Sequence, residues 1–428
     1  MAAGKLRVVV MQDGARLHYA MPRAIRRADM LAALYTDWYN DKSRLARMFI
    51  VLARRVRPLR AVRMEQRRSD DLDGVPIFDA KLLSIPILSL WSRWEIIQTI
   101  RRGAIRLRHR RLFHRGPIAE RARGVDVVLA FTYFVSLRYC RVMQSRGIKV
   151  VADQPIAAAR ELTRQRGLAD HRWPGWEPKQ TGAWLAQEIR REAALLPVLD
   201  HLLCASQYVK DSLVAQGIAA DKISVVPYPT DTVNFAPLDR RERTGPVVVG
   251  FVGSVNLRKG APWFLEVARR CDPKLVKFVM VGPIELTGYG QEQLRRHVEL
   301  IGSVPRSEVS QWLERFDIFL FPSTCEGSAG VVMEAMATAL PVITTPNSGT
   351  VARHGVDGFI AAYDQSDLLA QRVMELARDS RMRLAMGHSA RKRAEEFDID
   401  RYSRELAGLL SRIAGTQNTA RAAAPQAG

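Results

Sequence analysis

Residues 318–344 read IFLFPSTCEGSAGVVMEAMATALPVIT, and this stretch decides the fold class. The apolar run Ile318–Phe321 predicts a buried strand that ends at Pro322. Residues Ala329–Thr338 predict a helix, and Pro341–Thr344 predict the next strand. A strand, a helix and a strand in succession indicate parallel strands with the helix covering one face of the sheet.

The same alternation runs through the rest of the chain of 428 residues, which is long enough for two domains. In the second half we predict strands at Val247–Val252, Leu275–Val281 and Val298–Ile301, and helices at Ala261–Cys271 and Arg306–Phe316. In the first half we predict strands at Leu6–Met11, Val125–Phe131, Ile148–Ala152, Leu199–Ala205 and Ile223–Val226, and a helix from Pro22.

Residues 227–246 are rich in proline and charge and predict a linker between two doubly wound, Rossmann-like α/β domains. The domains are expected at 1–235 and 236–397. A last helix at about 398–413 is expected to pack back on the first domain, and the small polar residues of 415–428 predict a disordered tail.

The charge is unevenly distributed. The net charge is +21, and residues 1–235 hold 40 Lys and Arg against 22 Asp and Glu, whereas the remainder holds 25 against 22. The first half should therefore attract a polyanion or an anionic membrane, unless its arginines form only a solvated surface. Basic residues alternate with apolar and aromatic ones at 42–57 and 84–111, which is typical of interfacial segments and also of helices that cover a sheet.

Other classes of protein fit less well. No basic-aromatic motif accompanies the charge, so we expect no nucleic-acid partner. We find neither an uncharged apolar run of about 18 residues nor a signal-peptide pattern. Four scattered cysteines fit a reducing compartment. We therefore expect a cytoplasmic protein.

The first candidate site is the start of the helix after Ile318–Phe321. Its small residues leave backbone amides uncovered, as in sites for anionic oxygens; they are Gly327, Ser328, Ala329 and Gly330. Glu326 and Glu334 would lie about 12 Å apart if the segment between them were helical, too far for a hydrolase pair. This spacing favours one extended ligand with hydroxyls at both ends, such as a nucleotide-sugar. The alternative is an exposed helix with two solvated glutamates.

The second candidate site follows the strand at Val247–Val252. Gly253 and Ser254 end the strand, and Arg258 and Lys259 follow in the loop, where they could neutralise a diphosphate leaving group. The loop has neither the P-loop pattern nor the GxGxxG pattern. A basic loop before a helix is the alternative.

The first half offers weaker candidates. Gly14 follows the first strand, where ligands bind in open α/β sheets, and His18 lies in the same loop. Asp153 and Gln154 follow the strand at Ile148–Ala152. The DxD patterns at 71–73 and 398–400 lie away from the other motifs, so we predict no metal site.

Together these motifs resemble the signature of the large retaining family 4 of GT-B glycosyltransferases. The resemblance rests on Glu326 and Glu334 followed by Ala335-Met336-Ala337 and Pro341-Val342-Ile343, on the loop from Gly253 to Lys259-Gly260, on Val226-Pro227 with Asp231 and Phe235, on Cys204-Ala205-Ser206, and on Gly302-x-Val304-Pro305-Arg306. It covers about residues 199–410. Three departures are Ser254 where an arginine is frequent, Tyr228-Pro229-Thr230-Asp231 in place of an NGVD turn, and Asp153-Gln154-Pro155 where many relatives carry a histidine.

The resemblance implies two domains that face each other across a cleft, an acceptor-side first domain and a nucleotide-sugar-binding second domain. It implies that Glu334 holds the ribose, that Glu326 and the amides of Gly327–Gly330 hold the donor sugar, and that Arg258 and Lys259 hold the diphosphate. Gly14, His18, Asp153 and Gln154 would lie on the acceptor or sugar side.

The expected activity is that of a retaining hexosyltransferase. It would move a sugar from a UDP- or GDP-linked donor to a glycan or lipid-linked hydroxyl in surface polysaccharide or glycolipid synthesis. No cofactor is expected, and the protein could associate with the anionic inner face of the plasma membrane. A glycan phosphorylase on the same fold and a non-catalytic nucleotide-sugar sensor remain alternatives.

Overall fold

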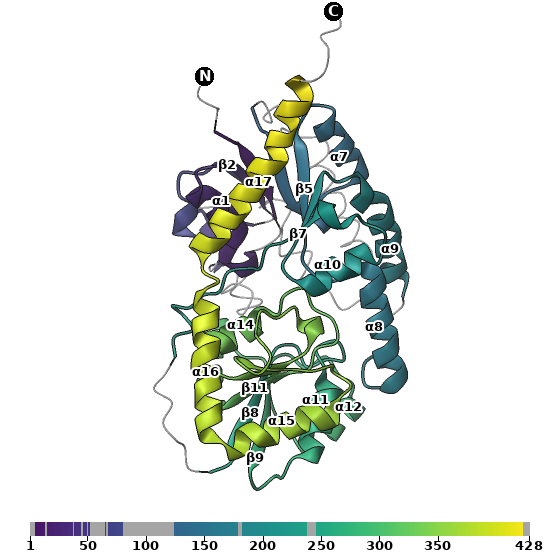
Figure 1. Cartoon of the computed structure of the whole chain (residues 1–428), viewed down its shortest axis with the longest axis vertical. Coiled ribbons are helices and arrows are strands. Elements are labelled where there is room, and N and C mark those ends of the chain that lie inside the picture. Colours follow the sequence, from purple (N-terminus) through teal and green to yellow (C-terminus); the bar gives the residue numbers. More distant parts are fainter. Residues whose placement is uncertain are drawn as a thin grey trace, which may run out of the picture. The chain divides into compact units, whose positions relative to one another are not determined.

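The computed structural model describes residues 5–12, 15–36, 38–43, 46–48, 50–51, 65, 67–79, 124–178, 182–237 and 245–422. Its strands form two sheets, as predicted (Figure 1). The first sheet has the order β3-β2-β1-β4-β5-β6-β7, and the second has the order β10-β9-β8-β11-β12-β13. All five pairings in the second sheet are parallel, as are the four recorded among β1–β5.

The strands of the first sheet lie close to the predicted positions where the apolar runs are long. They are β1 (Val8–Met11), β2 (Leu31–Thr36), β3 (Ile77–Asp79), β4 (Val127–Phe131), β5 (Lys149–Gln154), β6 (His201–Cys204) and β7 (Ile223–Val225). The helices between them are α1 (Ala20–Arg27), α7 (Leu137–Gln144), α8 (Ala159–Arg172), α9 (Ala183–Leu195) and α10 (Gln207–Val214). Strand β2, with six residues, and strand β3, with three, were not predicted.

The second sheet follows the predicted linker. Its strands are β8 (Val247–Val252), β9 (Val276–Val281), β10 (Glu299–Gly302), β11 (Ile318–Phe321), β12 (Val342–Thr344) and β13 (Gly358–Ile360). Its helices are α11 (Ala261–Arg270), α12 (Gly288–Arg295), α13 (Val309–Glu314), α14 (Gly330–Ala337), α15 (Ser366–Arg378) and α16 (Ser380–Glu395). In Figure 1, α11, α15 and α16 lie around this sheet.

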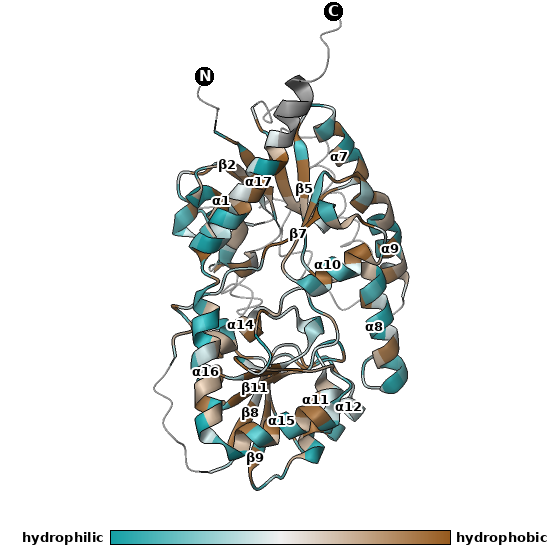
Figure 2. Cartoon of the chain, viewed as in Figure 1, coloured by the Kyte–Doolittle hydropathy of each residue, from teal (hydrophilic) through white to brown (hydrophobic). Residues whose placement is uncertain are grey.

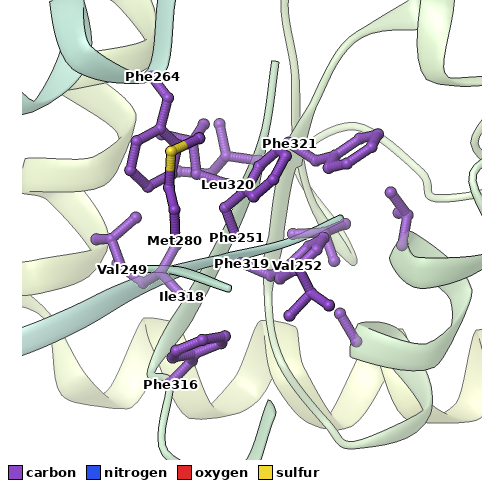
Figure 3. Close-up of a cluster of buried hydrophobic side chains, with 14 of the residues drawn as sticks. Val249, Phe251, Val252, Phe264, Met280, Phe316, Ile318, Phe319, Leu320 and Phe321 are labelled. Atoms are coloured by element: carbon purple, nitrogen blue, oxygen red, sulfur yellow. The ribbon is translucent and has the colours of Figure 1, made fainter. Parts of the chain in front are cut away.

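Phenylalanine rings pack among aliphatic side chains in the core of the second sheet (Figure 3). Phe251 on β8 and Phe321 on β11 stack with their ring centroids 5.3 Å apart, and Phe264 on α11 meets Phe251 edge to face at 5.9 Å. These rings are fully buried. Figure 2 shows the consequence: the strands of this sheet are hydrophobic, whereas α8 and α16 alternate between polar and apolar residues. The core therefore holds the ends of β8 and β11 firmly, where the candidate loops begin.

The chain forms two compact units. The first contains the described residues of 1–153, 194–203 and 402–428, and the second contains those of 154–193 and 204–401. The strands change sheet at the predicted linker, but the second unit also takes in segments that precede it. In the first unit, helix α17 (Ile399–Ala422) lies beside α1, and the Ser403 hydroxyl donates to the carbonyl of Ala24 at 2.7 Å (Figure 1).

Two predicted features fall wholly or partly outside the described residues. Helix α17 continues to Ala422, within the segment for which the sequence predicts disorder, and residues 423–428 are not described. Of the two basic segments, 84–111 lies outside the described residues, as does most of 42–57. Among the helices within the described ranges, none is both long enough and apolar enough to cross a bilayer.

Candidate functional site

The loop after β8 turns sharply because of a glycine. Gly260 has a φ of +86°, and a Cβ atom there would lie 2.0 Å from the carbonyl oxygen of Pro322. Only glycine can therefore bring the start of α11 so close to the end of β11. The contact places Arg258 and Lys259 against the loop that carries Glu326.

Arg258 and Lys259 converge on one carboxylate oxygen. Arg258 Nη1 lies 2.6 Å and Lys259 Nζ lies 2.8 Å from Glu326 Oε1. Burial raises the pKa of Glu326, but the two cations outweigh it and lower this pKa below its usual value. The side chain of Glu326 is 11% exposed, so these charges interact with little screening from solvent. The structure therefore brings together the three residues that the sequence predicted to be catalytic.

The two loops also interlock through their backbones. The carbonyl of Arg258 accepts hydrogen bonds from the amide and hydroxyl of Thr324 at 2.9 and 3.0 Å, and from the Ser323 hydroxyl at 3.0 Å. Among the described residues, Arg258, Lys259 and Ser323 donate hydrogen bonds to the Glu326 carboxylate, and Oε1 accepts all of them. The second oxygen of Glu326 therefore keeps its capacity to accept hydrogen bonds from a ligand.

The start of α14 offers some of the predicted amides. In the described part of the chain, the N–H groups of Gly327, Ser328 and Gly330 have no recorded acceptor. The prediction is wrong for Ala329, because its N–H donates to the carbonyl of Ser348 at 2.9 Å. In the other loop, the amide of Gly253 extends the sheet by donating to the carbonyl of Val281 at 2.9 Å, and Ser254 beside it is half-buried; a contact of these two residues with the donor stays a prediction.

Gly327 packs closely against an earlier segment of the same compact unit. A Cβ atom at Gly327 would lie 1.9 Å from the carbonyl oxygen of Pro155, the residue after Gln154. The Ser206 hydroxyl, at the start of α10, donates to the carbonyl of Gly327. The family-like serine after β6 therefore helps to position this loop, a role that the sequence did not reveal.

Glu334 has a partner that the sequence did not identify. Arg306 donates from Nη1 and Nη2 to the two carboxylate oxygens of Glu334, the first at 2.9 Å, and it lies 5.1 Å from the ring centroid of Phe235. Burial lowers the pKa of Arg306, but the pairing with Glu334 outweighs it and raises this pKa. Each oxygen retains a lone pair for a ligand hydroxyl. Because α14 begins only at Gly330, the estimate of about 12 Å for a continuous helix from Glu326 does not apply.

The first-half candidates have different environments. Gly14 lies outside the described residues. His18 is exposed in a run of left-handed residues after β1, with a φ of +50°. Asp153 is 1% exposed near the end of β5. The pKa of Tyr402 is raised mainly by the burial of Tyr402 and further by the negative charge of Asp153.

Gln154 binds another buried side chain. It is 2% exposed, and its Nε2 donates to Glu192 Oε1 at 3.0 Å. The other oxygen of Glu192 accepts the amide of Ala159 at 2.8 Å, at the start of α8, and burial raises the pKa of Glu192. In this structure Gln154 therefore holds the start of α8, and a contact with a sugar remains a prediction.

The aspartates of the two DxD patterns have local partners. Asp71 accepts from Arg23 at 2.7 Å, and Asp73 accepts from Arg68. Asp398 accepts the amide of Arg401 at the start of α17. Within the described ranges, no group of three or more His, Cys, Asp or Glu side chains could hold a metal ion. The expected absence of a metal site stays a prediction.

Comparison with known proteins relates part of this chain to glycosyltransferases. Residues 246–379 match the family model for glycosyl transferases group 1. The chain is 28% identical over 229 residues to the amylovoran biosynthesis glycosyltransferase AmsK of Erwinia amylovora. This alignment covers 50% of this chain and 56% of AmsK. It is 30% identical over 244 residues to the putative colanic acid biosynthesis glycosyltransferase WcaL of Escherichia coli, covering 53% and 58%. The chain thus spans little more than half the length of these relatives.

Similar solved structures cover nearly the whole chain. The Anabaena protein HepE in complex with UDP has a TM-score of 0.60 at 14% identity, over 95% of this chain and all of HepE. Sucrose-phosphate synthase from Thermosynechococcus elongatus has a TM-score of 0.59 at 13% identity, over 96% and 100%. Two parallel, helix-covered sheets with these neighbours define the GT-B class of fold. Over residues 246–379, which lie in the second unit, the chain matches the group 1 glycosyl transferases of that class.

Proposed function

We propose that this protein is a retaining glycosyltransferase that moves a hexose from a nucleotide-diphospho-sugar to a hydroxyl of a glycan or lipid-linked acceptor. The observation that carries the proposal is the convergence of Arg258 and Lys259 on Glu326, beside the start of α14, where the amides of Ser328 and Gly330 donate to no acceptor among the described residues. Two cations and a set of amides in a nearly buried site suit a ligand that has anionic and hydroxyl-bearing parts.

The chemistry follows from how charge changes when the donor bond breaks. Negative charge develops on the diphosphate as the sugar departs, and Arg258 and Lys259 are fixed where they would stabilise it. Glu326 would accept hydrogen bonds from sugar hydroxyls through its second oxygen. The acceptor hydroxyl would attack on the face that the diphosphate leaves, so retention would require no protein nucleophile.

Glu334 would hold the ribose of the donor. Arg306 fixes the plane of its carboxylate through two hydrogen bonds, so the remaining lone pairs keep a constant direction. A planar carboxylate with two free lone pairs suits two neighbouring hydroxyls. In this scheme no cofactor is required, because the donor itself supplies the leaving group.

The relatives support the donor and acceptor classes. AmsK and WcaL are named for the synthesis of amylovoran and colanic acid, and a further relative from Staphylococcus aureus, CapM, is named for capsular polysaccharide. HepE is described in complex with UDP and with UDP-glucose. We therefore propose a UDP- or GDP-linked donor and a place in surface polysaccharide or glycolipid synthesis.

A thermal-shift screen against UDP, GDP and their sugars tests the proposal. At about 100 times its dissociation constant, the right nucleotide should stabilise the protein by roughly 2.7 kcal/mol. Glu334→Ala should lose most of this stabilisation, because a buried hydrogen bond to a charged group contributes about 1.5–3 kcal/mol. Glu375→Ala, which removes a partly exposed carboxylate paired with Arg372 on α15, is the control and should keep it.

Two results would contradict parts of this proposal. Equal affinity of the wild type and Glu334→Ala for the free nucleotide would remove Glu334 from the ribose site. Turnover of a sugar 1-phosphate, with no binding of any nucleotide, would identify a phosphorylase instead.

We also propose that the first half of the chain binds anionic membranes reversibly from the cytoplasmic side. Where 42–57 is described, Met48 and Val51 are 56% and 53% exposed, and their spacing puts them on one helical face. Each nearby Arg or Lys contributes about 1 kcal/mol at an anionic surface. A few such residues would therefore suffice for reversible binding.

Co-sedimentation with vesicles that contain phosphatidylserine tests the membrane proposal. Binding should rise with the anionic fraction, fall with salt, and fall again when Arg54, Arg55 and Arg57 become Glu. The matched control reverses Arg269, Arg295 and Arg296 in the second unit and should bind like the wild type. A protein that ignores anionic vesicles at low salt would argue for a soluble acceptor.

A further inference from the structure

A short segment of the first half of the sequence is attached beside the candidate diphosphate loop. Residues 173–178 follow α8 and belong to the compact unit of the second sheet. The carbonyls of Gly175 and Trp176 accept hydrogen bonds from the hydroxyl and amide of Thr287, at 2.6 and 2.8 Å. Trp173 meets Trp263 on α11 edge to face, with their ring centroids 5.9 Å apart. The segment is therefore held by hydrogen bonds to Thr287 and by the packing of Trp173 against α11.

This segment delivers one carboxylate to the loop. Glu177 Oε1 accepts the backbone N–H of Leu257 at 2.6 Å, although the two residues are 80 positions apart. Leu257 directly precedes Arg258 and Lys259 and is 3% exposed. Glu177 therefore contacts the turn that sets the direction of both cations.

Three other amides in and after this turn are satisfied locally. Lys259 N donates to the Asn256 side chain at 2.9 Å, Gly260 N donates to the carbonyl of Leu257 at 3.0 Å, and Ala261 N donates to that of Asn256 at 3.1 Å. Asn256 in turn donates to Glu285 at 2.7 Å. Leu257 N–H depends on Glu177, and without an acceptor a buried N–H would be left unsatisfied.

We propose that Glu177 is a positioning residue that holds the Leu257–Lys259 turn, and through it both cations, in the orientation that binds the donor diphosphate. Lys259 Nζ reaches Glu326 at 2.8 Å, with its side chain only 16% exposed. A loop that carries charges into such a site must be fixed to within about 0.5 Å for the charges to act on a reacting group. The hydrogen bond from Leu257 supplies that constraint from outside the loop.

Glu177 acts through the loop and contacts neither cation in the structure. Loss of Glu177 should therefore weaken the binding of the second phosphate of the ligand more than the binding of the nucleoside. The inference rests on the proposed function, because it takes the ligand of Arg258 and Lys259 to be a nucleoside diphosphate. The inference is tested separately, because it changes Glu177 and compares a nucleoside diphosphate with the matching monophosphate.

The test compares affinities for a nucleoside diphosphate and the matching monophosphate, UDP with UMP or GDP with GMP, in the full-length protein. Glu177→Ala should lower the affinity for the diphosphate by about tenfold and leave that for the monophosphate within about twofold. Glu177→Gln should restore the wild-type preference, because the amide oxygen can accept the same N–H. The control is Glu375→Ala, which should behave as the wild type.

The outcomes are distinct. An unchanged preference for the diphosphate in Glu177→Ala would overturn the proposal, as would equal losses for both nucleotides, which would indicate a role in folding alone. If Glu177→Ala fails to fold, Glu177→Gln decides: an altered preference in that folded variant would overturn the proposal, and a wild-type preference supports it. A wild-type protein that binds neither UDP nor GDP would overturn the proposed function itself, and the role of Glu177 toward that ligand with it.

Discussion

Replacing Lys259 with alanine is expected to lower kcat for sugar transfer by about 10²–10³-fold, as does the loss of one preorganised donor in other enzymes. The KM for the donor should rise far less. Lys259 Nζ is held 2.8 Å from Glu326 Oε1 and lies 5.1 Å from the ring centroid of Phe321, so it is oriented before any ligand arrives. A charge fixed in advance stabilises the departing diphosphate more than the intact donor, whose charge is smaller.

Steady-state kinetics with the donor found by the thermal-shift screen provide the measurement. Lys277→Ala is the control, because Lys277 is 57% exposed, pairs with Glu299 at the surface and contacts no candidate residue. An increase of KM with kcat unchanged would mean that Lys259 binds donor and transition state equally, and it would lose its catalytic role. Lys259→Arg should recover part of the rate, because it restores the charge but not the position of the single ammonium.

Long apolar runs predicted most of the strands, although the run at 31–35 in β2 was missed. Val247–Val252 and Ile318–Phe321 agree with β8 and β11 residue for residue, because strands buried on both faces contain uninterrupted apolar side chains. Strands β3 and β13 have three residues each and give no such pattern. The predicted domain boundary at residue 235 lies between β7 and β8, where the chain passes from the first sheet to the second. The grouping of 154–193 with the second sheet depends on tertiary contacts such as that of Glu177, which no local pattern encodes.

The candidate site was predictable where its residues follow directly on a buried strand. Glu326, Arg258 and Lys259 were predicted from two loops that each follow a buried strand, and parallel strands bring such loops to one edge. Ala329 was predicted wrongly, because its acceptor belongs to Ser348, in a separate loop after β12.

Two partners of the site had no clear signal. Arg306 was part of a family-like motif, but its pairing with Glu334 joins residues 28 positions apart and depends on how α14 packs. Glu177 was not suggested at all, since a glutamate in a loop of Trp, Pro and Gly is ordinary in sequence. Both act by orienting another group, and orientation is a property of the folded structure.

Replacing Glu326 with alanine is expected to reduce the free energy of unfolding at pH 7 by about 3 kcal/mol, the lower end for breaking a buried ion pair. The variant leaves Arg258 and Lys259 close together, with side chains 33% and 16% exposed and no shared anion. Denaturant unfolding that follows the transition of the second unit measures the effect. The control is Glu375→Ala, whose pair with Arg372 is more exposed, and its cost should stay below about 1 kcal/mol.

The electrostatic origin of the stability that Glu326 contributes can be tested by pH, through the difference in free energy of unfolding between the wild type and Glu326→Ala. The pKa of Glu326 is lowered in the folded protein by Lys259 and Arg258, against the effect of burial, whereas an unfolded glutamate has a pKa of about 4.3. The folded state therefore favours the ionised form, and the stability that Glu326 contributes is fully present above the unfolded pKa. It is lost as the pH falls through the lower, folded pKa. The gap between wild type and Glu326→Ala should accordingly be constant from about pH 6 to 8 and shrink below about pH 4. A gap that stays unchanged into acid would show that alanine acts by leaving a cavity, and the two cations would then not be what holds Glu326 in place.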